Sequence, residues 1–417
     1  MHANMSSSNR DQSVSQRQDL SQTTTNPSAL NDFSRYVGLK KTSGINGYGK
    51  SDDYVSIRAL KEYWNKSSVG NILHSFNPPI NVDIDDIIKR YLRTFSILVY
   101  INRVPYIRHF MQYDYDDEKG LPYNETMSFG LPKSDETCKV WENILKNQWI
   151  FCPFQFGPKK IYLRPLDQRC ILPIDVIRQL TPDTLDEEAA VVQVVKLHPD
   201  YDRLLPVSLK PCVFAYVRCT NIDDSWQATT RQIVFKKYGS QRSRELWENE
   251  VGIFTSIKGQ GACDQIVEYY GSFSQGETFT TMLEYADKGT LLDVMMSSRP
   301  MESEELFRLW LNLADLFKGL IRIHGLENPD PQKGKRTYVL RTYVFPAYLK
   351  NFISLMAFSI HLDIKPANIL VFQGETDSPF DFRFKLADFS SSHIRKAFAW
   401  GPDTKGSETG GTQMYST

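Results

Sequence analysis

The sequence predicts an α+β protein in which a mostly helical module precedes a region of strands and then further helices. Apolar residues recur every three or four positions after Asp83, which is the spacing of one helix face. Residues 232–238, 266–273 and 279–286 read instead as short strands rich in β-branched and aromatic side chains. A second apolar helical stripe covers 302–324. With 417 residues, the chain is long enough for two or three domains.

Composition excludes several classes of protein. Lysine plus arginine and aspartate plus glutamate number 49 each, so no net field attracts nucleic acid or an anionic membrane. The 6 cysteines form no C-x-x-C pair and have no histidine at ligand spacing, which predicts reduced thiols and neither disulfides nor zinc. No apolar signal segment and no run of membrane-spanning length is present. We therefore expect a cytoplasmic protein, with the nucleus as the alternative, and no nucleic-acid or membrane partner.

The N-terminal part of the chain divides into a tail and a module. Residues 1–45 are rich in Ser, Asn, Gln and Thr, and we expect them to be a disordered tail. Residues 46–174 are expected to form the helical module, with one helix after the capping Asp83 and shorter helices within 55–64 and 134–149. We interpret the aromatic and aliphatic residues of this module as plain core, and a cofactor or substrate site as the alternative.

Polar residues at fixed spacing mark the strongest motif. Residues 361–370 read HLDIKPANIL, which places Asp363, Lys365 and Asn368 just before an apolar run. A second acid, Asp388, follows Asn368 by 20 residues in the sequence KLADFS. The two segments resemble the catalytic loop and the metal-binding loop of the eukaryotic protein kinase family, written H-R-D-x-K-x-x-N and D-F-G. The alternative is a polar turn after a strand.

The resemblance implies a role for each residue. Phosphoryl transfer depends mainly on positioning groups and neutralising charge around the phosphates. Asp363 would accept or orient the proton of the substrate hydroxyl, and Lys365 would lie near the transferred phosphate. Asn368 and Asp388 would hold Mg²⁺ through the hard oxygen ligands that this ion prefers.

The strand at 232–238 resembles the lysine-bearing strand of the same family. Lys236 occupies the lysine position, and the alternation of Ile233 and Phe235 favours it over Lys237. Glu250 lies on an otherwise apolar face of the next helical stretch, as an ion pair with Lys236 would require. The alternative is a solvated carboxylate on the helix surface.

The strand at 279–286 ends like a kinase hinge. By resemblance, Leu283 is the gatekeeper, and the backbone groups of Glu284 and Ala286 would bond the adenine edge of ATP. The kinase-like region as a whole covers 175–417. We expect a strand-rich smaller lobe over about 175–286 and part of a helical lobe over 287–417.

The glycine-rich hairpin expected to cover the phosphates is altered. Residues 187–199 read EEAAVVQVVKLHP, and no glycine lies between Gly157 and Gly239. Glycines allow a close backbone approach to phosphate, so their loss should impair nucleotide affinity or geometry. A misplaced phosphate loop is the alternative, although another placement in this interval restores no glycine.

Further departures concern the larger lobe. The connection 326–360 has 35 residues where the family has a short one, and we hypothesise that part of it comes from a retained intron. Leu362 and Ser390 replace the arginine of H-R-D and the glycine of D-F-G. The chain stops at Thr417, just after the G-T-x-x-Y of 411–415, so we expect an incomplete lobe with exposed apolar surface.

Two functions follow from the sequence. The first is an ATP- and Mg²⁺-dependent kinase that phosphorylates Ser and Thr hydroxyls of a protein substrate. The second is a pseudokinase or interaction module with little or no turnover. The complete set of polar catalytic residues favours the first, whereas the lost glycines, Ser390 and the missing helices favour the second.

Overall fold

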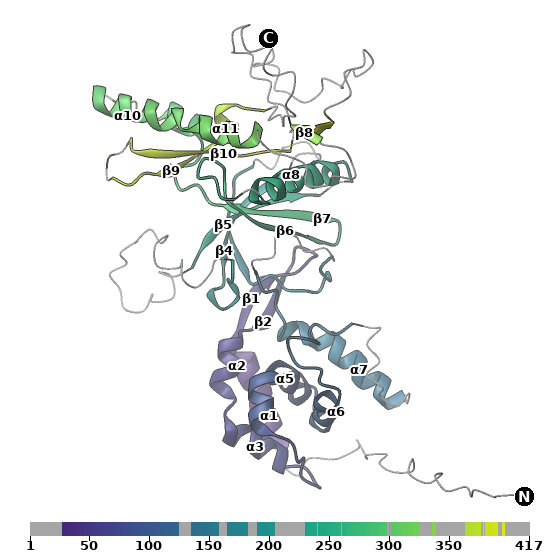
Figure 1. Ribbon diagram of the computed structural model, residues 1–417. Coiled ribbons are helices and arrows are strands. Elements are labelled where there is room, and N and C mark those ends of the chain that lie inside the picture. Colours follow the sequence, from purple (N-terminus) through teal and green to yellow (C-terminus); the bar gives the residue numbers. More distant parts are fainter. Residues whose placement is uncertain are drawn as a thin grey trace, which may run out of the picture. The chain divides into compact units, whose positions relative to one another are not determined.

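The chain divides into two compact units. The computed structural model describes residues 27–124, 135–157, 165–181, 190–204, 230–239, 241–259, 261–297, 300, 302–324, 336–338, 363–376, 378, 380–390 and 394–396. The first unit consists of Met1–Gly44, Ser51–Phe154 and Cys170–Leu172, and the second of Ile45–Lys50, Gln155–Arg169 and Pro173–Thr417. Helices dominate the first unit, and the second contains a mostly antiparallel sheet with helices, which confirms the predicted α+β class (Figure 1).

The first unit packs short helices around one buried helix. Its described elements are α1 (Pro27–Lys40), β1 (Lys41–Ile45), β2 (Ser51–Val55), α2 (Ile57–Tyr63), α3 (Lys66–His74), α4 (Ile84–Arg90), α5 (Leu92–Tyr100), η1 (Val104–Tyr106), α6 (Ile107–Gln112), α7 (Asp135–Asn147) and η2 (Gln148–Ile150). Helix α5 contacts α1, α2, α4, α6 and α7, and all but two of its 9 residues are buried. The Asp117 carboxylate accepts hydrogen bonds from the backbone N–H groups of Arg93 and Thr94 at 2.7 and 3.0 Å. It thereby satisfies donors at the start of α5 that have no partner within the helix.

The beginning of the described chain differs from the predicted disordered tail. Residues 27–40 form α1, and residues 41–45 form β1. Leu30, Phe33 and Val37 of α1 are buried in the core of the first unit. These three apolar residues share one helix face, and average composition over residues 1–45 conceals that spacing.

Two predicted long helices are each divided in two. The helix expected after Asp83 breaks at Tyr91, where the backbone leaves helical geometry between α4 and α5. The helix expected over 302–324 is α10 (Ser303–Ala314) followed by α11 (Leu316–His324), with Asp315 between them. An apolar stripe continues across such a break when both helices bury the same side, so periodicity alone does not reveal the break.

The second unit is built on a five-stranded antiparallel sheet. The strand order is β3-β4-β5-β7-β6, and helix α8 packs on β5 and β7 (Figure 1). The sheet and helix confirm the strands and the helix predicted over 232–286. Their bounds are β3 (Ile174–Gln179), β4 (Val191–Leu197), β5 (Gln232–Tyr238), α8 (Gln241–Gly259), β6 (Tyr269–Gln275) and β7 (Thr278–Glu284).

A second hairpin and three helices follow the sheet in the same unit. Helices α10 and α11 contact β10, and α9 contacts β9, so the helices pack on this hairpin. One core joins Phe254 of α8, Leu316 of α11, Leu386 of β10 and Phe389. These elements are α9 (Leu291–Met296), η10 (Pro366–Asn368), β9 (Ile369–Gln373), β10 (Phe382–Leu386) and a separate pair, β8 (Arg336–Tyr338) with β11 (Ile394–Lys396); η3 (Pro199–Tyr201) lies earlier, between β4 and β5.

Apolar side chains are exposed along α10 and α11, as the sequence predicts. Phe307, Trp310 and Ile321 are 69%, 62% and 71% exposed. None of the helices in the described ranges combines the length and the apolarity needed to cross a bilayer.

Several predicted features lie outside the described residues. They are the tip of the altered glycine-loop hairpin at 182–189, nearly all of the connection 326–360, Leu362, and the G-T-x-x-Y segment at 411–415.

Candidate active site

Strand β5 and helix α8 bring Lys236 and Glu250 together. The Lys236 Nζ lies 2.9 Å from the Glu250 Oε1, so the predicted ion pair is present. The strand alternation places Lys236 on the face of the sheet that α8 covers, and Glu250 lies in the middle of that helix. The Glu250 side chain is 0% exposed, which excludes the alternative of a solvated helix carboxylate.

Lys236 also reaches an acid far along the chain. Its Nζ lies 2.7 Å from the Asp388 Oδ1, across a separation of 152 residues. Burial alone would lower the pKa of Lys236, but the carboxylates of Asp388 and Glu250 outweigh it and raise that pKa well above its ordinary value. Lys236 is therefore a charged ammonium group held between two carboxylates.

Asp388 is held in a specific conformation after β10. Burial alone would raise the pKa of Asp388, but the charge of Lys236 and hydrogen bonds from Lys236 and Ser390 hold it well below its usual range. The Ser390 hydroxyl donates to the Asp388 Oδ1 at 2.7 Å. The φ of Asp388 is +64°, in the left-handed region that non-glycine residues seldom occupy. Outliers of this kind concentrate at functional sites.

The segment that begins at Asp363 forms a polar turn whose residues contact one another. The Lys365 Nζ lies 2.7 Å from the Asp363 Oδ2. The Asn368 Nδ2 donates to the same Oδ2 and to the Asp363 carbonyl oxygen, each at 2.9 Å. Because the Asn368 Nδ2 faces Asp363, the Asn368 Oδ1 is directed away from Asp363 and can accept a cation.

The hairpin of β9 and β10 brings this turn close to the segment of Asp388. The two strands are antiparallel, and Ile369 at the start of β9 pairs with Leu386 at the end of β10. The Ala387 N–H donates to the Asn368 carbonyl at 3.0 Å, one residue before Asp388. Residues just before β9 and just after β10 therefore lie at the same end of the ladder.

The predicted hinge residues lie at the end of β7. Leu283 is buried, and the Glu284 N–H donates to the Glu268 carbonyl at 3.0 Å. The Glu284 carboxylate pairs with the Nζ of Lys385 on β10 at 2.6 Å. The Ala286 carbonyl accepts the Gly289 N–H at 3.3 Å. The end of β7 is thus tied to β10 by an ion pair, while its role as a hinge and adenine recognition by Glu284 and Ala286 stay predictions.

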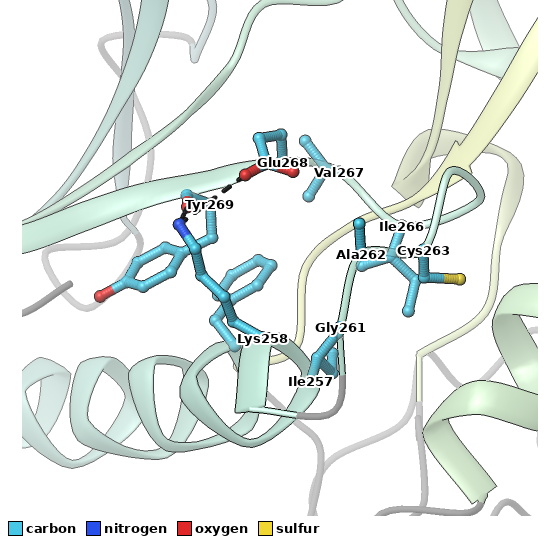
Figure 2. A pocket seen from close by; sticks show the side chains of 10 residues that line it. Ile257, Lys258, Gly261, Ala262, Cys263, Ile266, Val267, Glu268 and Tyr269 are labelled. Carbon is cyan, nitrogen blue, oxygen red and sulfur yellow. Dashed lines mark hydrogen bonds and ion pairs between the residues drawn. The ribbon is translucent and has the colours of Figure 1, made fainter. Parts of the chain in front are cut away.

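A small cavity lies elsewhere in the second unit. It has a volume of about 120 Å³ and is lined by the end of α8 and by residues 261–263 and 266–269. Figure 2 shows the Lys258 ammonium directed toward the Tyr269 carbonyl, its hydrogen-bond partner at 3.0 Å, and toward Glu268. None of the predicted site residues lines it. The lining is mostly apolar, so the cavity offers no set of groups for phosphate chemistry.

Few side chains of this site could serve as ligands of a metal ion. Within the described ranges, no group of three or more His, Cys, Asp or Glu side chains could hold a metal ion. Asp388 and Asn368 instead offer one carboxylate and one amide oxygen. This donor set suits Mg²⁺, which usually takes one or two protein ligands and completes its shell with water and substrate phosphates.

Sequence reasoning missed two contacts of this site. The Tyr238 hydroxyl donates to the Glu250 Oε2 at 2.5 Å, and the Phe389 N–H donates to the Glu250 Oε1 at 3.3 Å. Tyr238 follows Lys236 by two positions, so alternation could have placed both side chains on one face of β5.

No protein-family model matches the chain, and no curated protein matches it either.

Proposed function

We propose that the chain is a Ser/Thr-type protein kinase that transfers the γ-phosphate of ATP to hydroxyl groups of a protein substrate, and that its second unit has a kinase-like bilobal fold. The observation that carries the proposal is the position of the Lys236 Nζ. It lies 2.9 Å from the Glu250 Oε1 and 2.7 Å from the Asp388 Oδ1. Kinases require an ion pair between a lysine on the third strand and a helix glutamate, together with a metal-binding aspartate. Lys236 lies on β5, the third strand of its sheet in chain order.

The remaining residues would have complementary roles. Lys236 would bind the α- and β-phosphates, and the backbone at Glu284 and Ala286 would contact adenine. Asp363 would orient the substrate hydroxyl and accept its proton, and Lys365, which is 2.7 Å from Asp363, would contact the transferred phosphate.

The metal would be held by the same end of the β9–β10 hairpin. Asn368 through its Oδ1 and Asp388 through its carboxylate would be the protein ligands of Mg²⁺. When bound, the ion supplies positive charge that neutralises the β- and γ-phosphate oxygens. Lys236 and Asp388 would then exchange their direct contact for contacts with phosphate and metal.

One observation favours a pseudokinase as the second candidate. The charged groups of the site already neutralise one another, because Lys236 pairs with Asp388 and Lys365 pairs with Asp363. Such a set is stable without a nucleotide. The sequence of 158–238 also lacks the glycines of a phosphate-binding loop. Both features fit a protein that keeps the fold for binding a partner and has lost phosphate transfer.

Nucleotide binding and phosphate transfer separate the two candidates. We expect millimolar ATP to raise the melting temperature of the wild-type protein more with Mg²⁺ than without it. Asp363→Asn should retain this shift and reduce phosphate transfer by about 10²-fold or more, because it removes the proton acceptor. Asp264→Asn, at an exposed position on the α8–β6 connection, is the matched control. Transfer that persists in Asp363→Asn would remove Asp363 from its role, and no shift with ATP would argue against the kinase.

A further inference from the structure

Tyr238 completes the set of contacts around Glu250. It follows Lys236 by two residues on β5, so both side chains lie on the same face of the strand. The Tyr238 hydroxyl donates to the Glu250 Oε2 at 2.5 Å, while the Oε1 accepts from the Lys236 Nζ at 2.9 Å and from the Phe389 N–H at 3.3 Å. Both oxygens of the carboxylate are thus held by separate donors.

The Tyr238 side chain is suited to a permanent donor role. Burial and the negative charge of Glu250 raise the pKa of Tyr238 well above its ordinary value, so the hydroxyl keeps its proton. The ring is only 1% exposed, and the Lys236 Nζ lies 5.4 Å from its centroid, within cation–π range. Tyr238 therefore contacts both members of the Lys236–Glu250 pair.

Holding both oxygens matters because the two carboxylates compete for Lys236. The Lys236 Nζ is 2.7 Å from Asp388 and 2.9 Å from Glu250. The terminal torsion of a glutamate side chain is broad, so a carboxylate held by one oxygen alone can rotate. The short hydrogen bond from Tyr238 restricts this rotation and keeps the Glu250 Oε1 directed at Lys236.

We propose that Tyr238 is a positioning residue that fixes Glu250, and through it Lys236, for the phosphates of a nucleotide. The proposal rests on the proposed kinase function of the same site. Tyr238 contacts no reacting atom: its hydroxyl acts through Glu250, and its ring lies beside Lys236. Removal of its hydroxyl leaves a buried carboxylate oxygen without that donor and allows Lys236 to move toward Asp388.

The test compares Tyr238→Phe with a matched control, Tyr269→Phe. Tyr269 is a buried tyrosine on β6 whose hydroxyl bonds Ser272 at 2.9 Å, so its variant also loses one buried hydroxyl of the same sheet. We expect Tyr238→Phe to raise the KM for MgATP about tenfold and to leave kcat within about twofold, because Lys236 binds phosphate in the ground and transition states alike. A purely structural role would instead lower the active fraction at unchanged KM.

Hydrogen exchange provides a measurement that does not depend on catalysis, and a double-mutant cycle tests whether Tyr238 and Glu250 act as one unit. Amides of α8 around Glu250 should exchange about tenfold faster in Tyr238→Phe than in Tyr269→Phe. In a Glu250→Gln background, Tyr238→Phe should have little additional effect on KM, because the two residues act as one unit.

The outcomes distinguish failure of this role from failure of the kinase function. A wild-type protein that binds no nucleotide overturns both. A protein that binds nucleotide, but shows equal KM values and equal α8 exchange in the two tyrosine variants, overturns the role of Tyr238 only. Additive effects in the cycle would also overturn it.

Discussion

Two charged clusters, one in each unit, differ sharply in burial. In the first unit, Arg90 pairs with Asp114 and Asp116, and its side chain is 39% exposed. In the second unit, Lys236 pairs with Glu250 and Asp388, and its side chain is 11% exposed. Both clusters join residues that are distant in sequence. In the second, the Lys236 and Glu250 side chains are withdrawn from solvent and Asp388 stays 33% exposed, whereas in the first both Arg90 and Asp114 are more than one-third exposed.

The difference in burial indicates that the Arg90 and Lys236 clusters have different roles. Exposed ion pairs are screened by salt and contribute little to stability. A buried cluster requires the desolvation of every member, and well-packed apolar side chains would often be at least as stable. The burial of the Lys236 cluster is therefore poorly explained by a gain in stability. It is better explained by a functional site that holds charged groups in place.

The largest expected effect is the loss of Glu250. Glu250→Ala leaves the ammonium of Lys236 buried with one counter-charge fewer, so we expect the second unit to lose about 3 kcal/mol of unfolding free energy. Glu248→Ala on the same helix is the control, because Glu248 and its partner Arg244 are both more than half exposed. Hydrogen exchange of β5 and α8 across a urea series measures both variants. Equal losses of unfolding free energy in the two variants would contradict the prediction that the buried Lys236–Glu250 pair contributes more than the exposed Arg244–Glu248 pair.

Lowering the pH should reduce the unfolding free energy of both units by less than the loss of Glu250 does. The pKa of Asp388 is held well below its usual range by Lys236 and Ser390, and hydrogen bonds from Lys119 and Arg90 lower the pKa of Asp114 to about 2. A depressed pKa adds stability above the pKa of the unfolded carboxyl, about 3.9, and this stability is lost as the pH falls from about 5.

The two acids should respond differently to salt in the same pH series. Asp388→Asn should flatten the acid loss of stability in the second unit at both low salt and 0.5 M NaCl. Asp114→Asn should flatten that of the first unit only at low salt, because ions screen its exposed partners. Urea midpoints between about pH 6 and pH 3, followed by hydrogen exchange in each unit, provide the measurement. Salt sensitivity of the Asp388 effect would contradict the burial argument.

Much of the second unit could be predicted from its sequence. Alternation in 232–238 selected Lys236 over Lys237, and one charged residue on an apolar helix face selected Glu250. Local periodicity suffices for both choices, because each concerns the face of a single element. The Lys236–Asp388 contact could be expected only by resemblance, since no local pattern links residues 152 positions apart.

Other features could not be predicted from local pattern. The hydrogen bond from Tyr238 depends on how closely α8 approaches β5, and the left-handed backbone of Asp388 depends on the contacts around it. Helix α1 was missed because its three buried side chains lie in a polar surrounding sequence. The break at Tyr91 was missed because α4 and α5 bury the same core side.

Binding of MgATP to a matched pair of lysine variants tests the central claim most directly. Lys236 and Lys237 are adjacent on β5 and point to opposite faces, and Lys237 contacts neither Glu250 nor Asp388 in the described part of the site. In titration calorimetry we expect Lys236→Met to weaken MgATP binding by about tenfold or more, since a desolvated charge-assisted contact is lost, and Lys237→Met to bind like the wild type. Binding that is equal in the two variants, or absent from the wild type at millimolar MgATP, would contradict the account.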